Sequence, residues 1–166
     1  MTIIQERDLP NIRKKYMSKK IVCCTGTFDL THAGHVLFFE DCKKHGDIFV
    51  VGIGKDSLIK AYKGDLRPIL NEHVRLKTVD SLKPVDYAYL MSGEWNNEDP
   101  HPFTLGTLFD KLKPNVYAVN SDVKDIDKRK KLTDLYGVQL VVLDRWCPKD
   151  FENISTSKII ETIKRL

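Results

Sequence analysis

Two histidines, His32 and His35, stand three residues apart in the segment 24–35, which reads Cys-Thr-Gly-Thr-Phe-Asp-Leu-Thr-His-Ala-Gly-His. The segment follows an apolar run and leads into a helical pattern, which places both histidines on one face at the start of a helix. The N–H groups and the dipole of a first helical turn favour negative charge. The motif therefore predicts a binding site for a polyphosphate.

Alternating strand and helix patterns supply the elements that must hold this turn. Short apolar, β-rich runs predict strands over 20–25, 48–53, 87–90, 115–119 and 138–143. Helical patterns predict helices over 33–45, 72–82, 103–112, 124–136 and 156–165. This alternation predicts an α/β fold, a single doubly wound, Rossmann-like, five-stranded parallel sheet with helices on both faces. Ligands of such sheets bind beyond the carboxyl ends of the strands, where the histidine segment falls.

The length and charge of the chain limit its class. A length of 166 residues suits a single domain over 1–166, in which 1–19 form a basic N-terminal arm or helix. The composition, 42% apolar and 30% charged, is that of a globular protein. The formal net charge is only +4, and Lys and Arg are spread along the chain. This pattern favours a phosphate-rich small molecule over nucleic acid as the ligand.

Cysteine usage and hydropathy indicate the compartment. The four cysteines show no paired C-x-x-C spacing, and two of them are adjacent inside an apolar strand pattern, so we expect reduced, structural thiols. No apolar run approaches the roughly 18 residues of a membrane span, and the N-terminus lacks the pattern of a signal peptide. We therefore expect a cytoplasmic protein without a membrane span.

Three parts of the chain, in order, carry a family resemblance. Residues 26–35 are similar to the motif G-x-F-D-x-x-H-x-G-H, and residues 154–159, Ile-Ser-Thr-Ser-Lys-Ile, to I-S-T-[ST]-x-I. Between them stand Lys63 and Arg75, at spacings that the family shares. The chain thus resembles, over nearly its whole length, the nucleotidyltransferases with an H-x-G-H motif.

The resemblance implies the reaction. In this family the phosphate of an acceptor attacks the α-phosphorus of a nucleoside triphosphate directly, and pyrophosphate leaves without a covalent enzyme intermediate. Such a reaction needs the alignment of two anionic reactants and hydrogen-bond donors at the α-phosphoryl oxygens. The expected partners are a nucleoside triphosphate and a phosphorylated small molecule, either a phospho-alcohol or a sugar phosphate.

Two branches of the family compete for the identity of the nucleotide. Segments 26–29 and 154–157 resemble the glycerol-3-phosphate, choline-phosphate and ethanolamine-phosphate cytidylyltransferases. Segments 9–13 and 63–69 resemble the adenylyltransferase domain of heptose-phosphate bifunctional enzymes, and archaeal FAD synthetases share parts of both. We expect a cytidylyltransferase that uses CTP. The alternative is an adenylyltransferase that uses ATP with a heptose-1-phosphate or FMN-type acceptor.

Residue roles follow from the matching motifs. The resemblance implies that His32 and His35 bind the triphosphate and stabilise the transition state, and that Lys63, in the loop after the second strand, reaches the phosphates. Gly34 lets the backbone approach the phosphates, because no side chain blocks it. The nucleotide-binding positions implied in the same way are Gly26, Thr27, Phe28, Gly34, Asp122, Arg145, Ser155 and Thr156, with Arg75 and Asn120 as further candidates.

Some of these residues also suit a purely structural role. Arg75, on an amphipathic helix, fits a salt bridge at the sheet edge as well as a nucleotide contact. Ser155 and Thr156 fit an N-cap of the final helix, which is compatible with phosphate contact. The segment 146–153 follows Arg145, where the cytidylyltransferase motif has only a few residues before its I-S-T.

No protein metal site is visible in the sequence. We expect Asp29 to stabilise the turn before the helix, because Asp side chains bond nearby backbone N–H groups, and Mg²⁺ to be held mainly by the triphosphate. The polar loop 92–102 is either a plain surface connection or a lining of the acceptor pocket, and the segment 146–153 is the other candidate for that lining. The identity of the acceptor depends on the shapes of the loops around 92–102 and 120–128. Because small relatives are often homodimers, we expect a homodimer. The remaining histidines, which we assign no role, are His45, His73 and His101.

Other classes of protein fit the sequence less well. Class I aminoacyl-tRNA synthetases share H-x-G-H, but their second motif follows the histidines, whereas the similar segment 17–20 precedes them here. A dinucleotide oxidoreductase is excluded because no G-x-G-x-x-G follows the first strand. A catalytically silent nucleotide-binding module remains as the second alternative.

Overall fold

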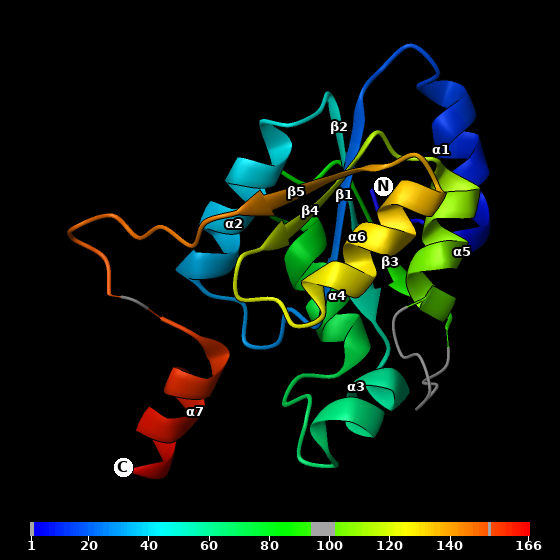
Figure 1. Cartoon of the computed structure of the whole chain (residues 1–166). Coiled ribbons are helices and arrows are strands. Elements are labelled where there is room, and N and C mark those ends of the chain that lie inside the picture. The colour runs from blue at the N-terminus through cyan, green and yellow to red at the C-terminus, as the bar shows by residue number, and fades with distance from the viewer. Residues whose placement is uncertain (1, 94–101, 153) are drawn as a thin grey trace.

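Five parallel strands form one sheet in the computed structural model, which describes residues 2–93, 102–152 and 154–166, and the side chains of all these except 102–104. The strand order is β3-β2-β1-β4-β5, and every pairing is parallel (Figure 1). The strands are β1 (Ile21–Gly26), β2 (Ile48–Gly54), β3 (Tyr87–Met91), β4 (Val116–Asn120) and β5 (Gln139–Leu143). The predicted Rossmann-like sheet is therefore confirmed.

Helices connect the strands in the expected alternation. After a short 3₁₀ turn at Glu6–Asp8 they are α1 (Leu9–Lys15), α2 (Ala33–Lys43), α3 (Asp56–Lys63), α4 (Glu72–Asp80), α5 (Pro102–Leu112), α6 (Ile126–Leu135) and α7 (Thr156–Lys164). Helix α3 was not predicted, and our placement of Lys63 in a loop was wrong, because Lys63 is the last residue of this helix. The helix has only eight residues and buries only Leu58 and Ile59, which is too short a pattern to show helical periodicity.

Alternation along β1 divides the core between two faces of the sheet. Val22 and Cys24 point to the face covered by α2 and α4, where Phe39 and Val79 also pack. Residues of the opposite parity, such as Cys23, point to the face covered by α1 and α5. Burying both faces requires strands that are apolar throughout, as the sequence pattern showed. We refer below to the α2/α4 face and the α1/α5 face.

The last helix differs from the expected layer arrangement. Helix α7 has no buried residue and extends away from the sheet, at the end of a long connection from the edge strand β5 (Figure 1). Its first residue nevertheless returns to the start of α2, because the Thr156 hydroxyl donates to the Asp29 carbonyl oxygen at 2.8 Å. The histidine motif and the C-terminal Ile-Ser-Thr motif thus come together at the start of α7.

The topology places the histidine segment at the switch point of the sheet. The chain leaves β1 toward β2 and β3 on one side, and β4 and β5 lie on the other. In open sheets of this kind the ligand crevice lies beyond the carboxyl ends of the strands at that point. No helix among residues 2–93, 102–152 and 154–166 is long and apolar enough to cross a membrane.

Candidate active site

A tight turn at the end of β1 supports the histidines from below. Phe28 has a left-handed backbone (φ 51°), and its ring folds back over Gly26, where a Cβ atom would lie 2.7 Å from the ring. The ring packs edge-on against Phe39 and against His35, with centroids 4.9 Å and 5.6 Å apart. Phe28 is therefore a buried core residue that positions His35. Its expected place among the nucleotide-binding residues stays a prediction.

The two imidazoles lie together at the start of α2. His32 is the N-cap residue, and its Nδ1 accepts from the Gly34 N–H at 3.1 Å. The His35 Nδ1 accepts from the His32 N–H at 3.3 Å, and the ring centroids are 4.0 Å apart. A neutral imidazole whose Nδ1 accepts carries its proton on Nε2. Each histidine thus offers one Nε2–H donor.

Burial keeps both histidines neutral. It lowers the pKa of His35 to about 3, and the neighbouring His32 and Arg145 contribute to this shift. Burial, and then the Arg145 guanidinium, also lower the pKa of His32. At neutral pH the pair therefore acts as two aligned neutral donors rather than as two cations.

Gly34 packs closely against the His32 ring. A Cβ at this position would lie 3.0 Å from Cε1 of His32, which is a tight contact, and 3.5 Å from the carbonyl oxygen of Ile154, which is an ordinary one. The absence of a side chain thus lets the His32 ring lie over the helix start.

Asp29 anchors a distant loop rather than the turn beside it. Its buried carboxylate accepts from the backbone N–H groups of Ile69 and Leu70 at 2.9 and 3.0 Å, and from Nε of Arg67 at 3.1 Å. The prediction that Asp29 bonds nearby backbone groups is therefore wrong, because its partners lie about 40 residues further along the chain. These bonds satisfy the carboxylate within the protein, and the described part of the chain contains no group of three or more His, Cys, Asp or Glu that could hold a metal ion.

Lys63 reaches the crevice from the end of α3. Its Nζ donates to the Thr27 hydroxyl at 3.1 Å, and that hydroxyl is also 2.8 Å from the Tyr62 hydroxyl. Burial, and then the Arg67 guanidinium, lower the pKa of Lys63. Because the Lys63 charge also lowers the pKa of His35, the ammonium group and the histidine pair are within electrostatic reach of each other.

Arg75 is a structural tie. Its side chain is fully buried, and its guanidinium donates to the carbonyl oxygens of Thr27, Gly54 and Leu70 at 2.7 to 2.9 Å and to the Asp56 carboxylate at 2.7 Å. Of the two roles that its sequence position left open, the geometry supports the salt bridge. Arg75 fixes the ends of β1 and β2 relative to each other and does not face the crevice.

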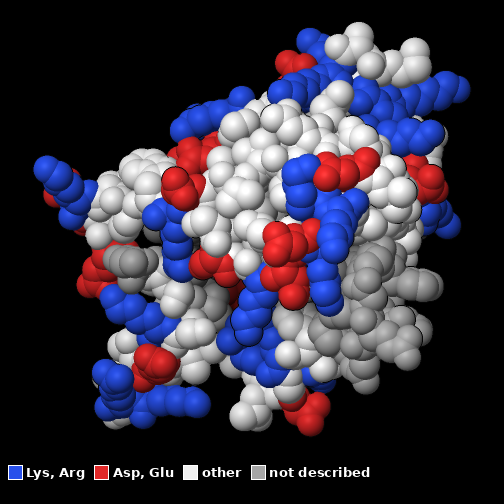
Figure 2. Space-filling model, viewed as in Figure 1, with Lys and Arg blue, Asp and Glu red and all other residues white. Residues whose placement is uncertain are grey.

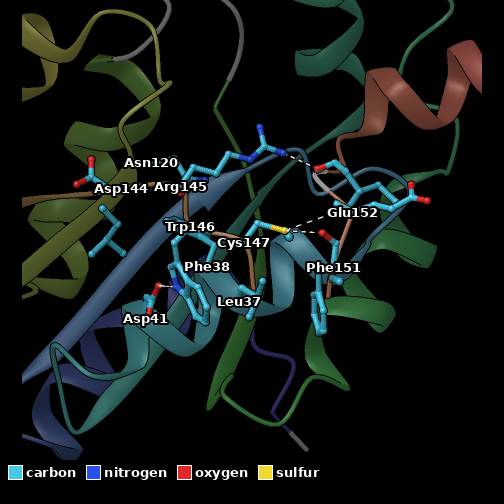
Figure 3. A pocket seen from close by; sticks show the side chains of 14 residues that line it. Leu37, Phe38, Asp41, Asn120, Asp144, Arg145, Trp146, Cys147, Phe151 and Glu152 are labelled. Carbon is cyan, nitrogen blue, oxygen red and sulfur yellow. Dashed lines mark hydrogen bonds between the residues drawn. The ribbon is translucent and has the colours of Figure 1, made fainter. Parts of the chain in front are cut away.

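Arg145 approaches the histidines from the end of β5. Its guanidinium donates to the Ile154 carbonyl oxygen at 2.5 Å and pairs with Asp122 at 3.3 Å. Arg145 is therefore in contact with the start of the α7 segment despite the added length of 146–153 (Figure 3). Ser155 caps α7 by accepting from the Lys158 N–H at 3.2 Å.

A pocket lies beside Gly34 on the α2/α4 face (Figure 3). Helix α2, the ends of β4 and β5, and the loop before α7 form its walls. Asn120 lines it, and the Trp146 indole N–H closes one side by donating to the Asp41 carboxylate at 2.7 Å. Neither Trp146 nor Asp41 was singled out in the sequence, because a lone Trp and a helical Asp carry no motif.

Charge on the face shown in Figure 2 is mixed. Lys and Arg side chains stand among Asp and Glu over most of this face and gather mainly at its upper edge. Such a mixture agrees with the mild net charge of +4 and with a small anionic ligand.

The structure thus gathers most of the predicted residues around one helix start. His32, His35, Gly34 and Arg145 lie together, and Lys63 with Thr27 faces them. Most of the predicted acceptor loop 92–102, together with His101, lies outside the described residues.

Comparison with known proteins finds a matching family profile and similar proteins. A family profile described as cytidylyltransferase-like matches residues 23–162. The chain belongs to the cytidylyltransferase-like family. An FAD synthase from Methanothermobacter marburgensis is 37% identical over 151 residues, 89% of this chain and 87% of that protein. The bifunctional protein HldE of Helicobacter pylori strain J99 is 38% identical over 147 residues, 89% of this chain but only 28% of HldE. This cytidylyltransferase-like chain therefore spans less than a third of the HldE relative.

Solved structures agree with the family and the fold. A lipopolysaccharide core biosynthesis protein from Thermoplasma volcanium is 28% identical, with a TM-score of 0.58 over 77% of this chain and 97% of that one. A pantothenate synthetase from Thermus thermophilus, 16% identical, shares the fold with a TM-score of 0.65 over 99% of this chain and 70% of its own. The names of the HldE and FAD synthase relatives do not mention CTP, so the expected preference of this family member for CTP gains no support.

Proposed function

We propose that the protein is an adenylyltransferase, which moves the adenylyl group of ATP to a phosphorylated small molecule and releases pyrophosphate. The observation that carries this proposal is the convergence of His32, His35, Lys63 and Arg145 at the start of α2. ATP takes the place of the CTP first expected. One reason is that the relatives include the bifunctional protein HldE, and the sequence resembles the adenylyltransferase domain of heptose-phosphate bifunctional enzymes. The other is that they include an FAD synthase, whose product contains an adenylyl group.

Positioning and charge stabilisation account for the chemistry. An oxygen of the acceptor phosphate forms a bond to the α-phosphorus, and the bond from that phosphorus to the oxygen bridging to the β-phosphorus breaks. That oxygen leaves with the electron pair as part of pyrophosphate. The attacking phosphate is already anionic, so the protein needs to supply no general base. The Nε2–H groups of His32 and His35 donate to the phosphoryl oxygens as their charge grows, and the dipole at the start of α2 favours negative charge at the same place.

Two basic side chains, Lys63 and Arg145, approach the histidine pair from different elements of the fold. Lys63 comes from α3, beside Thr27, and Arg145 comes from the end of β5. A pair of cations on either side of the histidines suits a ligand whose negative charge is spread over three phosphates. The described residues supply no carboxylate cage, so we propose that Mg²⁺ enters on the phosphate oxygens of the nucleotide, as the sequence suggested.

The base of the nucleotide is proposed to bind in the pocket beside Gly34. The pocket combines apolar walls from Leu37 and Leu143 with the Asn120 amide, which both donates and accepts. Charged residues also line the pocket, namely Asp41, Asp144, Arg145 and Glu152. Apolar walls combined with polar groups suit a heteroaromatic base with hydrogen-bonding edges.

The choice of nucleotide is tested by pyrophosphate release. ATP and CTP are each supplied with glycerol 3-phosphate, phosphocholine, phosphoethanolamine, heptose 1-phosphate or FMN, and released pyrophosphate is measured. The proposal predicts release with ATP and one of the acceptors, at a kcat/KM well above that with CTP. Release with CTP alone would restore the cytidylyltransferase alternative. Thermal stabilisation by nucleotide without turnover on any acceptor would favour the catalytically silent module.

A further inference from the structure

The indole of Trp146 forms the far end of the pocket that begins beside Gly34. It lies against α2, near Leu37 and Phe38 (Figure 3). Its N–H donates to the Asp41 carboxylate at 2.7 Å, yet the residue is 50% exposed. A half-exposed indole leaves apolar ring surface in contact with water, and covering that surface with another flat ring is favourable. The exposed part of the ring is therefore available to a ligand in the pocket.

The carboxylate of Asp41 holds the polar edge of this ring. Its Oδ2 accepts from the indole N–H of Trp146, and its Oδ1 accepts from Nζ of Lys44 at 2.6 Å. The indole nitrogen is the only donor of a tryptophan side chain. Because this donor is already used, the ring offers a ligand its face and not its edge. A bond to an ionised acceptor is stronger than one to a neutral acceptor, so the ring is oriented before a ligand arrives.

The length of the pocket suits a nucleoside. The pocket follows α2 from Gly34 to Asp41, a separation of about 10 Å along a helix. The Gly34 end lies at the histidine pair, because the His32 ring packs against this glycine. When the α-phosphate is at the histidines, a ribose and a base laid along the helix bring the base to Trp146.

Arg145 and Trp146 are adjacent in the chain but point to different ends of the pocket (Figure 3). The Arg145 guanidinium donates to the Ile154 carbonyl oxygen, and its charge lowers the pKa of both histidines. The Trp146 indole turns toward α2 and Asp41. The cation thus faces the anionic part of a nucleotide, and the uncharged ring faces its base.

We propose that the base of the nucleotide stacks on the Trp146 indole and that Asp41 holds the ring in place for it. The inference rests on the proposed function for the nucleotide itself. Any base can stack on an aromatic side chain, because every base has a π-face. Adenine has two fused rings and cytosine has one, so adenine covers more of the indole and gains more from the contact. Trp146 therefore favours ATP over CTP.

The position of Trp146 in the chain agrees with this role. It stands in the segment 146–153, where the chain departs from the cytidylyltransferase motif by having more residues before Ile-Ser-Thr. The stacking surface is thus a feature of this chain and not of the motif.

Tryptophan fluorescence reports this contact directly. The chain contains two tryptophans, Trp95 and Trp146, so Trp95→Phe leaves Trp146 as the single indole fluorophore. ATP, CTP and inorganic tripolyphosphate are each titrated into this variant. Their Kd values are measured by calorimetry for wild type and for each further variant. Tripolyphosphate carries the charge of the nucleotide without its base, so it separates stacking from binding of the phosphates.

The proposal predicts that ATP quenches the Trp146 emission, whereas tripolyphosphate binds without quenching it. Trp146→Ala is expected to raise the Kd for ATP by about five- to fiftyfold, the loss expected for one stacked base, and to leave the Kd for tripolyphosphate unchanged. The ratio of the Kd for CTP to the Kd for ATP should fall in the same variant. Trp146→Phe keeps an aromatic ring and should restore most of the affinity for ATP.

A second pair of variants tests the support of the ring. Asp41→Ala removes the acceptor of the indole N–H, and Lys44→Ala is the matched control, because it removes the other partner of the same carboxylate. Asp41→Ala is expected to raise the Kd for ATP, by less than Trp146→Ala does, and to weaken the quenching. Lys44→Ala should match wild type.

Two results would overturn the inference. One is the same Kd for ATP in wild type and Trp146→Ala. The other is an equal rise in the Kd for ATP and for tripolyphosphate in Trp146→Ala, as expected if the substitution only disturbs the pocket. Binding decides both, whether or not an acceptor supports turnover, so absence of pyrophosphate release with every acceptor counts against the proposed function alone. Failure of wild type to bind ATP would contradict both proposals.

Discussion

The hydroxyl of Thr156 donates to the carbonyl oxygen of Asp29 at 2.8 Å, which joins two residues 127 positions apart. This bond ties the start of α7 to the turn that carries the histidines. Helix α7 buries none of its residues, so its position relative to the site depends on such contacts at its first turn. The C-terminal motif therefore acts on the site through its helix start.

Loss of that bond should impair turnover more than folding. Thr156→Val removes the donor. We expect kcat to fall by about tenfold, because small displacements at a reaction centre lower the rate strongly. The unfolding free energy should fall by only about 1 kcal/mol, the net contribution of one hydrogen bond. Thr156→Ser keeps the hydroxyl and should retain activity. Thr162→Val is the control, because that hydroxyl bonds the Lys158 carbonyl within the same helix. Equal activity of Thr156→Val and Thr162→Val would show that the bond has no role.

The fold was largely predictable because its signals are local. Each strand is a short apolar run, and the spacing of the histidine motif indicates that it lies at the start of a helix. Helix α3 was missed because it is short, whereas the unpredicted hydrogen bonds have another cause, since most of them join residues far apart in the chain. The carboxylate of Asp29 bonds backbone groups 40 and 41 residues away, and the guanidinium of Arg75 reaches carbonyls from three other segments. No spacing within one segment encodes these bonds.

Site residues follow the same division. The arrangement of His32, Gly34 and His35 could be predicted because helical periodicity places them, whereas the bond between Trp146 and Asp41 beside the pocket joins residues 105 positions apart. The packing of Phe28 against His35 was not predicted, because the sequence does not show the left-handed turn that brings the two rings together.

Substitution of Gly34 should displace a histidine without unfolding the protein. In Gly34→Ala the new Cβ would lie 3.0 Å from the His32 ring, which must move. We expect kcat to fall by about tenfold, because a shift of the ring by a fraction of an ångström should cost less than the roughly 10² of a 1 Å displacement, with an unchanged circular dichroism spectrum. The control is Gly106→Ala in α5, where the nearest atom is the hydroxyl of the flexible Tyr136 side chain. Full activity of Gly34→Ala would contradict the packing argument.

Lys63 should act on the rate more than on nucleotide binding. The partner charge of its ammonium group grows in the transition state, so Lys63→Ala is expected to lower kcat by about 10² and to change the Kd for ATP by much less. Lys60→Ala, at an exposed position on the same helix, is the control and should behave as wild type. Rapid-quench kinetics with calorimetry separates the two constants. An effect confined to Kd would assign Lys63 to ground-state binding.

The pKa of His35, lowered to about 3 from an ordinary value of 6.5, makes stability depend on pH. Between these values the unfolded chain binds a proton that the folded protein does not. The unfolding free energy should therefore fall as pH decreases from 6.5 toward 3, by an amount on the order of a few kcal/mol from this group. Urea denaturation of wild type and His35→Gln checks this, because the variant should show a shallower fall. Parallel curves would mean that His35 is not held neutral by folding.

The most direct test of the account concerns the two imidazoles as neutral donors to the α-phosphoryl group. Pyrophosphate release from ATP, with the acceptor that supports turnover, is measured for wild type, His32→Ala and His35→Ala, with His73→Ala at an exposed site on α4 as control. The account predicts that each of the two variants loses about 10² to 10³ in kcat while remaining folded, and that His73→Ala matches wild type. Turnover within a few-fold of wild type in either His32→Ala or His35→Ala would contradict it.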